Sequence, residues 1–402
     1  MKTIQINAVY GEKSTGLIVR DIQHMLEQNG IEAYVGYQKS NCPVYKGIQI
    51  GDKLDWKLHA AYTRITGKQG YASVNATKRF LKEIDPLCPE IIHLHNLHSN
   101  YINLPLLLEY CAEKNIKTML TLHDCWFLTG KCFHFFDIEC DRYKTGCYNC
   151  PKKNLDVPNY LWDRSAAVWS DRKRLFQQIN HLKVVGCSQW IAGIARQSEI
   201  FQGKQIISIK NGIDTDIFKK RNSRLKSEMN IENKFVILGM ANKWLLNENR
   251  NVVDEICQGV PDGSVIVLVG CDESQIEKLK VAKNIISLGY IKNREKLADL
   301  YSMADVFVNL SLIDSLPTVN MESIACGTPV ICYENAGGGT ELVEHGKTGY
   351  IVEKFNAAAI LRYINEIKSG SIDAEKCASE GREKYSNKNN YLKYLHAYER
   401  WD

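Results

Sequence analysis

Hydrophobic positions along the first half of the chain form short, strand-length runs separated by longer amphipathic stretches. Two of these stretches, Leu104 to Lys114 and Leu161 to Ile179, have the spacing of helices. Because strands that alternate with helices build parallel sheets covered by helices, this half predicts a doubly wound α/β domain. The strand-like runs are residues 3–9, 32–37, 91–95, 117–123, 183–187 and 205–210.

The same alternation begins again in the second half and includes a helical stretch from Arg294 to Met303. An Asn-Gly turn at residues 211–212 separates the two series. The sequence therefore predicts two Rossmann-like domains, residues 1–210 and 211–375, which face each other across a cleft. Residues 376–402 predict helices that pack back onto the first domain. The second series of strands comprises residues 235–241, 264–270, 285–289, 305–311, 329–333 and 350–352.

The composition is that of a globular protein, with 45% hydrophobic and 24% charged residues over 402 positions. The chain contains no apolar run of about 18 residues, and it begins with an alternating strand pattern in place of a secretory signal. Both features predict a cytoplasmic protein. The net charge of +5 points to no nucleic-acid partner.

One basic stretch, residues 56–82, contains six Lys and Arg residues and no acid, with aromatic residues interleaved. A solvated helical face gives this pattern. So does a surface that rests on anionic lipid headgroups, which would bring the protein to the inner membrane as a peripheral partner.

The strongest chemical signal is the segment from Asp314 to Glu322, which follows a predicted strand and opens a helix. Pro317 suits the first turn of that helix and Gly327 suits its end. Ligands of parallel sheets bind beyond the carboxyl ends of the strands, and a helix amino terminus favours a diphosphate. The two carboxylates can accept hydrogen bonds from sugar hydroxyls on either side of the phosphates.

This segment continues into an A-C-G-T-P-V run that ends at Val330, and then into Gly338 to Glu341. Together these motifs resemble the family 4 retaining glycosyltransferases of GT-B fold, over essentially the whole chain. The family has Glu where this chain has Asp314. The resemblance implies that Asp314 contacts the donor sugar and Glu322 the ribose, with Leu316 and Thr318 beside them.

The resemblance also implies basic residues on the donor phosphates, for which Arg250 and Lys243 are the candidates after the first strand of the second domain. Gly16, after the first strand of the chain, is the candidate for a loop that borders the donor. The family has a histidine at the donor sugar, and His123 at a strand end matches it. We therefore predict His123, Asp314 and Glu322 as the catalytic group.

Alternation places His93 and His95 on one face of a predicted strand. No acid nearby completes a metal site. We therefore expect His95 and Asn96 to line an acceptor pocket.

Four cysteines gather within a nineteen-residue segment of a predicted insertion at residues 125–151, and they end in a C-x-x-C pair. This pattern is typical of a structural zinc site, although four reduced thiols would give it as well, and an iron–sulfur cluster is a further alternative that no other redox feature of the sequence favours. The stretch resembles a branch of family 4 found in bacterial surface-polysaccharide pathways. The candidate ligands are Cys132, Cys140, Cys147 and Cys150.

The sequence thus predicts a retaining glycosyltransferase whose catalysis needs no metal. It would move a sugar from a nucleoside-diphosphate sugar to a glycan or lipid-linked acceptor, in the synthesis of capsule or another surface polysaccharide. A nucleotide-sugar epimerase of the same fold and a non-catalytic sugar-nucleotide-binding protein are the alternatives. An epimerase would work without an acceptor, and a non-catalytic protein would have no need of both acids.

Overall fold

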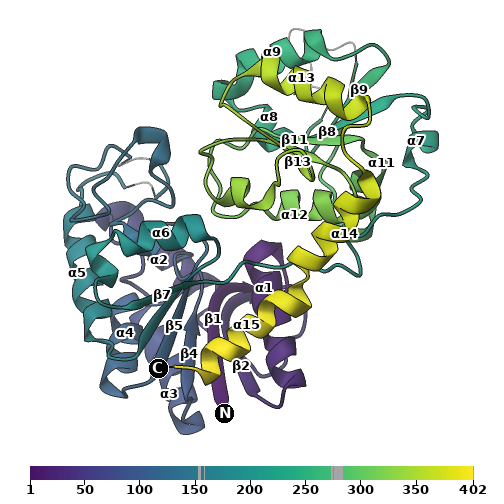
Figure 1. Cartoon of the computed structure of the whole chain (residues 1–402). Coiled ribbons are helices and arrows are strands. Elements are labelled where there is room, and N and C mark those ends of the chain that lie inside the picture. The colour runs from purple at the N-terminus through teal and green to yellow at the C-terminus, as the bar shows by residue number, and fades with distance from the viewer. Residues whose placement is uncertain (153–154, 158, 273–274, 276–283, 402) are drawn as a thin grey trace. The chain divides into compact units, whose positions relative to one another are not determined.

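The computed structural model describes residues 1–152, 155–157, 159–272, 275 and 284–401, and it divides into two compact units (Figure 1). The first unit comprises Met1–Asn211 together with Asn390–Asp402, and the second comprises Gly212–Asn389. Each unit has its own parallel sheet and its own hydrophobic core.

The sheet of the first unit has seven strands in the order β3-β2-β1-β4-β5-β6-β7, and all neighbouring strands are parallel. The order reverses between β1 and β4, so the loops after these two strands diverge. The strands are β1 (Lys2–Tyr10), β2 (Glu32–Ser40), β3 (Gly47–Gln49), β4 (Ile91–Leu94), β5 (Lys117–Leu122), β6 (Leu182–Gly186) and β7 (Gln205–Ser208).

One face of this sheet is covered by the first helix, α1 (Lys13–Gln28), and by the last, α15 (Asn387–Glu399), which share a buried cluster. Tyr394 and Tyr398 anchor α15 in that cluster. The other helices of the unit are α2 (Lys53–Thr66), α3 (Val74–Ile84), η1 (Asp85–Leu87), α4 (Leu104–Glu113), η2 (Trp126–Leu128), η3 (Phe136–Ile138), α5 (Ser165–Gln178), α6 (Gln189–Arg196) and η4 (Glu199–Phe201).

The sheet of the second unit has six parallel strands in the order β10-β9-β8-β11-β12-β13. Counted within the unit, this is the 3-2-1-4-5-6 order of dinucleotide-binding domains, with its switch point between β8 and β11. The strands are β8 (Phe235–Met240), β9 (Ser264–Val269), β10 (Ile285–Leu288), β11 (Val306–Asn309), β12 (Val330–Tyr333) and β13 (Gly349–Val352).

The core of the second unit lies between these strands and two of its helices, which Figure 1 shows on one side of the sheet, α9 (Arg250–Gly259) and α13 (Ala357–Lys368). The remaining helices are α7 (Leu225–Glu228), α8 (Ala241–Trp244), η5 (Asn247–Asn249), α11 (Arg294–Met303), α12 (Thr318–Ala325), η6 (Gly338–Leu342) and α14 (Ala374–Tyr385).

The predicted parallel sheets are confirmed, and all twelve predicted strands are present. Strand β3 has only three residues, too few for a recognisable pattern, and the sequence did not reveal it. The helix predicted from Leu161 begins at Ser165, where the backbone N–H of Ser165 donates to the Asp163 carboxylate at 2.9 Å. The preceding Leu161 and Trp162 are exposed, so their hydrophobicity reflects a surface loop and not a buried helix face.

Across the described residues, no helix combines the length and the apolar character that crossing a bilayer demands.

Candidate active site

The loops that follow β8 and β11 meet at the switch point of the second sheet, and one buried side chain joins them. The Asn249 amide nitrogen donates to the carbonyl oxygen of Lys243 at 2.7 Å and to that of Leu310 at 2.8 Å. The Tyr333 hydroxyl donates to the Asn249 amide oxygen at 3.3 Å. Asn249 therefore ties together the loops after three neighbouring strands. No motif marks it in the sequence beyond its place before Arg250.

Asp314 lies between β11 and α12 and is bound on several sides to the glycine-rich segment after β12. Its backbone N–H donates to Ala336 O at 2.9 Å, and its carbonyl accepts the Gly338 N–H at 2.9 Å. Its carboxylate accepts the Leu316 N–H at 3.0 Å. A Cβ at Gly337, where φ is +92°, would lie 2.1 Å from the Asp314 carbonyl oxygen, so only glycine fits there. The Asp314–Glu322 segment and the glycine-rich segment after β12, which are separate motifs in the sequence, therefore pack together as one loop structure.

Helix α12 begins just after this loop at Thr318, so Pro317 is its N-cap and lies just before the first turn in which it was predicted. Gly327, with φ +86°, follows the end of the helix, as predicted. The Asn309 amide donates to the Asn320 amide oxygen at 2.7 Å. The Asn320 amide nitrogen and the Ser315 hydroxyl are buried without a hydrogen-bond partner in the described part of the chain. Buried polar groups without a partner are rare in folded proteins, and these two lie in the loop and first turn of α12.

Glu322 lies further along α12, and its carboxylate accepts a hydrogen bond from the buried Tyr301 hydroxyl at 3.2 Å. Burial raises the pKa of Glu322 to about 7, although the charge of Arg294 and the Tyr301 hydrogen bond act to lower it. Glu322 therefore exchanges a proton near neutral pH. No motif in the sequence pointed to the partner of Glu322, Tyr301, which lies in α11.

The two predicted phosphate-binding residues both follow β8. Lys243 is half-buried within α8, and Arg250 is exposed at the first position of α9. Through Asn249, the Lys243 loop is joined to the end of β11, the strand that leads to Asp314. Leu316 is buried and Thr318 is the first residue of α12.

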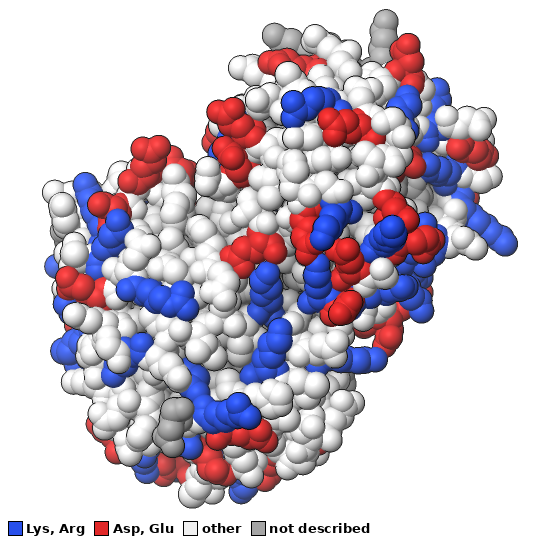
Figure 2. Space-filling model, viewed as in Figure 1, with Lys and Arg blue, Asp and Glu red and all other residues white. Residues whose placement is uncertain are grey.

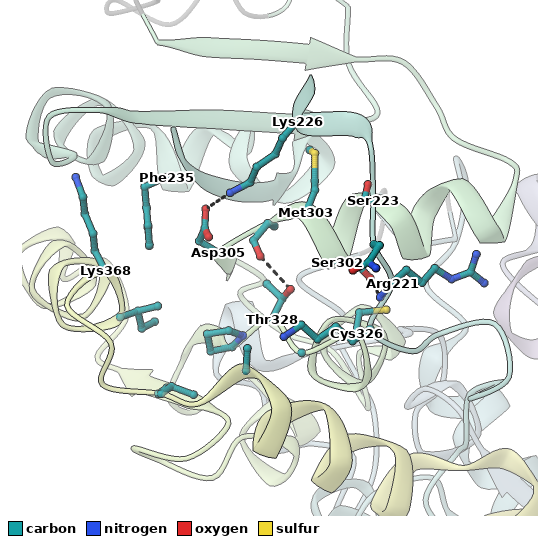
Figure 3. Close-up of a pocket in the computed structure, with 18 residues that line it drawn as sticks. Arg221, Ser223, Lys226, Phe235, Ser302, Met303, Asp305, Cys326, Thr328 and Lys368 are labelled. Atoms are coloured by element: carbon teal, nitrogen blue, oxygen red, sulfur yellow. Dashed lines mark hydrogen bonds and ion pairs between the residues drawn. The ribbon is translucent and has the colours of Figure 1, made fainter. Parts of the chain in front are cut away.

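A separate hollow of the second unit lies at the amino ends of its strands and is lined by residues that precede β8, β11 and β12 (Figure 3). Three of the basic residues that line it are paired with acids: Lys226 lies 2.8 Å from the Asp305 carboxylate, Lys220 lies 2.8 Å from Glu375, and Arg221 lies 3.8 Å from Asp299. The Thr328 hydroxyl donates to Ala304 O at 3.2 Å. Because ligands of such sheets bind at the carboxyl edge, this hollow is not the candidate site.

In the first unit, a chain of hydrogen bonds fixes the protonation of the predicted catalytic histidine. Gln5 donates its amide N–H to Val19 O at 3.2 Å, so its amide oxygen accepts from His95 Nε2 at 3.1 Å. His95 Nδ1 then carries a lone pair and accepts from His123 Nε2 at 3.1 Å. Burial lowers the pKa of His123 to about 4 and that of His95 well below its ordinary value. His123 is therefore neutral, with Nδ1 free of a proton and able to accept from a hydroxyl.

His93 has a structural position, between the Tyr398 hydroxyl at 2.6 Å and the Thr121 hydroxyl at 2.7 Å. A pair that the sequence did not single out lies nearby, with His98 Nε2 2.9 Å from the Asp124 carboxylate. Burial acts to raise the pKa of Asp124, but His98 and the Trp126 N–H outweigh it, and the pKa is lowered.

Asn96, which follows β4, and Gly16, which lies in α1, both contact strand β1. The Asn96 N–H donates to the Asn7 side-chain oxygen at 3.0 Å. Gly16 lies in the first turn of α1, where a Cβ would meet Val9 O at 3.1 Å. Its small size therefore allows α1 to pack against the end of β1.

The four clustered cysteines line one small pocket of the first unit. Within the described residues, no three His, Cys, Asp or Glu side chains are close enough together to hold a metal ion as placed.

On the face that Figure 2 shows, the described Lys and Arg residues are interspersed with Asp and Glu. A mixed surface of this kind is typical of globular proteins and differs from the basic stripe of nucleic-acid binders.

Residues 216–384 match the family described as glycosyl transferases group 1. The putative colanic acid biosynthesis glycosyl transferase WcaC of Escherichia coli K12 is 24% identical over 361 residues, which cover 82% of each chain. Sucrose-phosphate synthase from Thermosynechococcus elongatus has the same fold, with a TM-score of 0.70 at 15% identity over 99% of this chain and 98% of that one. HepE of Anabaena, solved with UDP and glucose, gives a TM-score of 0.63 at 16% identity over 99% of both chains.

These likenesses confirm the predicted fold and the predicted family, and they favour transfer over the epimerase alternative. The chain is a glycosyltransferase of the GT-B fold, and its residues 216–384 belong to the glycosyl transferases group 1 family.

Proposed function

We propose that the protein is a retaining glycosyltransferase whose donor is a nucleoside-diphosphate sugar, with the diphosphate at the amino end of α12. The observation that carries this proposal is the loop at Asp314, held against Gly337 and Gly338 where β11 ends, with Glu322 further along the same helix. The complex of HepE with UDP and glucose supports a donor of this class.

In this proposal the first backbone N–H groups of α12 bind the diphosphate, and Lys243 and Arg250 offset its charge. Asp314 accepts hydroxyls of the donor sugar and Glu322 those of the ribose.

The reaction breaks the bond between the sugar C1 and the diphosphate and forms a bond from C1 to the acceptor oxygen on the same face. The acceptor hydroxyl proton passes to the departing diphosphate, so the chemistry needs no metal. His123 accepts a sugar hydroxyl through its unprotonated Nδ1 and holds the orientation of the ring. His95 fixes the tautomer of His123, and Asn96 stays the proposed neighbour of the acceptor.

The similarity to a colanic acid glycosyl transferase supports a glycan or lipid-linked acceptor and a role in surface-polysaccharide synthesis. A lipid-linked acceptor would bring the enzyme to the cytoplasmic face of the membrane.

One surface of the first unit supports such a peripheral contact. Along α2, the side chains of Leu54 and Leu58 are each 62% exposed and Ile65 is 52% exposed, beside exposed Lys57 and Arg64. Backbone pairing of Tyr160 with Arg64 at 3.0 Å brings the exposed Tyr160–Trp162 loop next to this helix. Apolar side chains flanked by cations are typical of a helix that lies on anionic lipid.

Sedimentation with vesicles tests the membrane contact. Wild-type protein should sediment with vesicles that contain phosphatidylglycerol and stay behind with purely zwitterionic ones. A Leu54→Ser, Leu58→Ser double variant should lose this binding. Equal binding of the variant would contradict the contact.

The donor assignment is tested by incubating the protein with a panel of nucleotide sugars and following slow hydrolysis to free sugar and nucleoside diphosphate. Glu322→Gln should reduce turnover at least about tenfold, whereas Glu255→Gln, an exposed position on α9, should not. Unchanged turnover and nucleotide affinity in Glu322→Gln would refute the proposal. Epimerised sugar without hydrolysis would favour the epimerase.

A further inference from the structure

A second site, separate from the donor-binding residues, lies in the long insertion after β5. Cys132, Cys140, Cys147 and Cys150 line one small pocket there, together with aromatic and aliphatic side chains. We propose that these four thiolates bind one zinc ion, and that this ion is structural and holds the insertion on the first unit.

The spacing of two of the thiols supports a shared ion. Cys132 and Cys150 are eighteen residues apart in sequence, and their sulfur atoms are 3.9 Å apart. Two sulfurs on a tetrahedral zinc with bonds of about 2.3 Å are separated by about 3.8 Å. Cys147 belongs to the same C-x-x-C pair as Cys150, so both ends of the insertion reach one point. As placed, no three of the described Cys, His, Asp or Glu side chains are close enough together to hold a metal ion, so the proposal requires the side chains of Cys140 and Cys147 to turn toward this pair within the pocket that they share.

Backbone donors already surround two of the sulfurs. The Gly130 N–H donates to Cys147 Sγ at 3.2 Å, and the Lys152 N–H hydrogen-bonds the Cys150 thiol. Hydrogen bonds from backbone N–H groups orient thiolate ligands and stabilise their charge.

One buried cation, Arg172, lies near the pocket. Arg172 is fully buried. Its guanidinium donates hydrogen bonds to two backbone carbonyl oxygens, those of Trp126 and Thr129. Its Nε has no hydrogen-bond partner among the described residues. A buried cation is costly unless negative charge accompanies it.

Asp124 already lies within electrostatic reach of Arg172, and a zinc ion with four thiolates, whose net charge is −2, would add further negative charge there. Cys147 and Cys132 both lie within electrostatic reach of Arg172. Arg172 also stacks on Trp126, with the guanidinium 3.8 Å from the ring centroid. The cation thus connects the proposed metal centre to the residues that directly follow Asp124.

The insertion also needs a cross-link. From its last 3₁₀ helix, which ends at Ile138, to helix α5, which begins at Ser165, the described residues of the insertion and of the segment after it form no helix or strand. Irregular segments of more than about 12–15 residues are uncommon in compact domains, and metal binding supplies folding free energy to such segments. The balance of the step is simple: four thiols release four protons and bind one Zn²⁺, and nothing is oxidised.

The competing chemistry is a disulfide between Cys132 and Cys150, which removes two electrons and two protons and requires an oxidant. The sulfurs would have to approach from 3.9 Å to about 2.05 Å. The experiment must therefore distinguish zinc, a disulfide and four free thiols.

The full-length protein, purified without a metal-affinity tag, should contain about one zinc per chain by elemental analysis. Serine variants of Cys132, Cys140, Cys147 and Cys150, made singly, should each retain less than about a fifth of that metal. Cys42→Ser and Cys88→Ser, at two exposed cysteines outside the insertion, should retain all of it.

Cobalt provides a readout that does not depend on how the variants fold. Wild-type protein in which Co²⁺ replaces Zn²⁺ should show the intense visible bands of a tetrahedral tetrathiolate site. The proposal would be overturned by metal-free protein in which all four cysteines of the cluster can be alkylated. It would also be overturned by a mass lower by two hydrogens, which indicates a disulfide. Neither result bears on donor binding, which is measured with different residues.

Discussion

At the scale of single residues, Glu322 combines a functional assignment with a cost to the fold. Burial raises its pKa from 4.5 to about 7, so the folded protein binds this proton more tightly than the unfolded chain. Its contribution to stability is therefore complete below about pH 4.5 and is lost as the pH rises through about 7.

Glu322→Gln removes this titration. We expect the stability of the wild type, relative to the variant, to fall between about pH 5 and pH 8, by at most roughly 1.4 kcal/mol per pH unit. Urea denaturation at both pH values measures the difference. The exposed Glu255→Gln serves as the control, and a pH-independent difference for Glu322→Gln would contradict the assignment of the shift.

Gly337 and Gly346 form a second comparison at this scale, because both have positive φ but only one is crowded. At Gly346 a Cβ would meet nothing within 4 Å, whereas at Gly337 it would meet the Asp314 carbonyl. We expect Gly346→Ala to cost about 1 kcal/mol and Gly337→Ala more than about 3 kcal/mol. Denaturation curves and nucleotide titrations measure both, and Gly337→Ala should also weaken nucleotide binding.

At the scale of elements, α15 packs its buried tyrosines into the core of the first unit, and hydrogen bonds to its carboxyl end hold it there as well. The buried Lys183 of β6 donates to Ala397 O at 3.0 Å and to Arg400 O at 2.6 Å. These carbonyls at the end of the helix would otherwise lack partners, and the positive charge also suits the helix dipole.

Lys183→Met keeps the aliphatic length but removes the donor and the charge. We expect a loss of about 2 kcal/mol and faster amide hydrogen exchange in the last turns of α15. Lys117→Met is the matched control, since both lysines lie over the Trp401 ring, Lys117 at 5.8 Å and Lys183 at 4.7 Å, but Lys117 is exposed. Equal effects of the two variants would show that the ring contact, and not the capping, matters.

At the scale of the whole molecule, two units with separate cores should unfold in two thermal transitions. A nucleoside diphosphate bound at α12 should increase the free energy of unfolding of the second unit alone, by about 2.7 kcal/mol at a hundredfold excess over Kd. Only the transition temperature of that unit should therefore rise. Calorimetry with UDP and with GDP measures the shift and discriminates between the bases. Glu322→Gln should reduce it. A shift confined to the first unit would contradict the donor assignment.

The sequence by itself determined every strand except the short β3, the two parallel sheets and the loop-helix segment from Asp314 to Glu322. These features depend on hydrophobic periodicity, on Pro317 and on Gly327, which act between close neighbours in the chain. Local patterns also marked the cysteine segment and the candidate histidines.

Only the tertiary structure decided which partners complete these features. Asn249 meets Leu310, Tyr301 meets Glu322, and Lys183 meets the end of α15, each across a separation that no local pattern encodes. The tautomer of His123 likewise depends on Gln5 and His95, which the order of strands β1, β4 and β5 brings beside it. The physical reason is that sheet order and burial, set by the chain as a whole, place these side chains together and shift their pKa values.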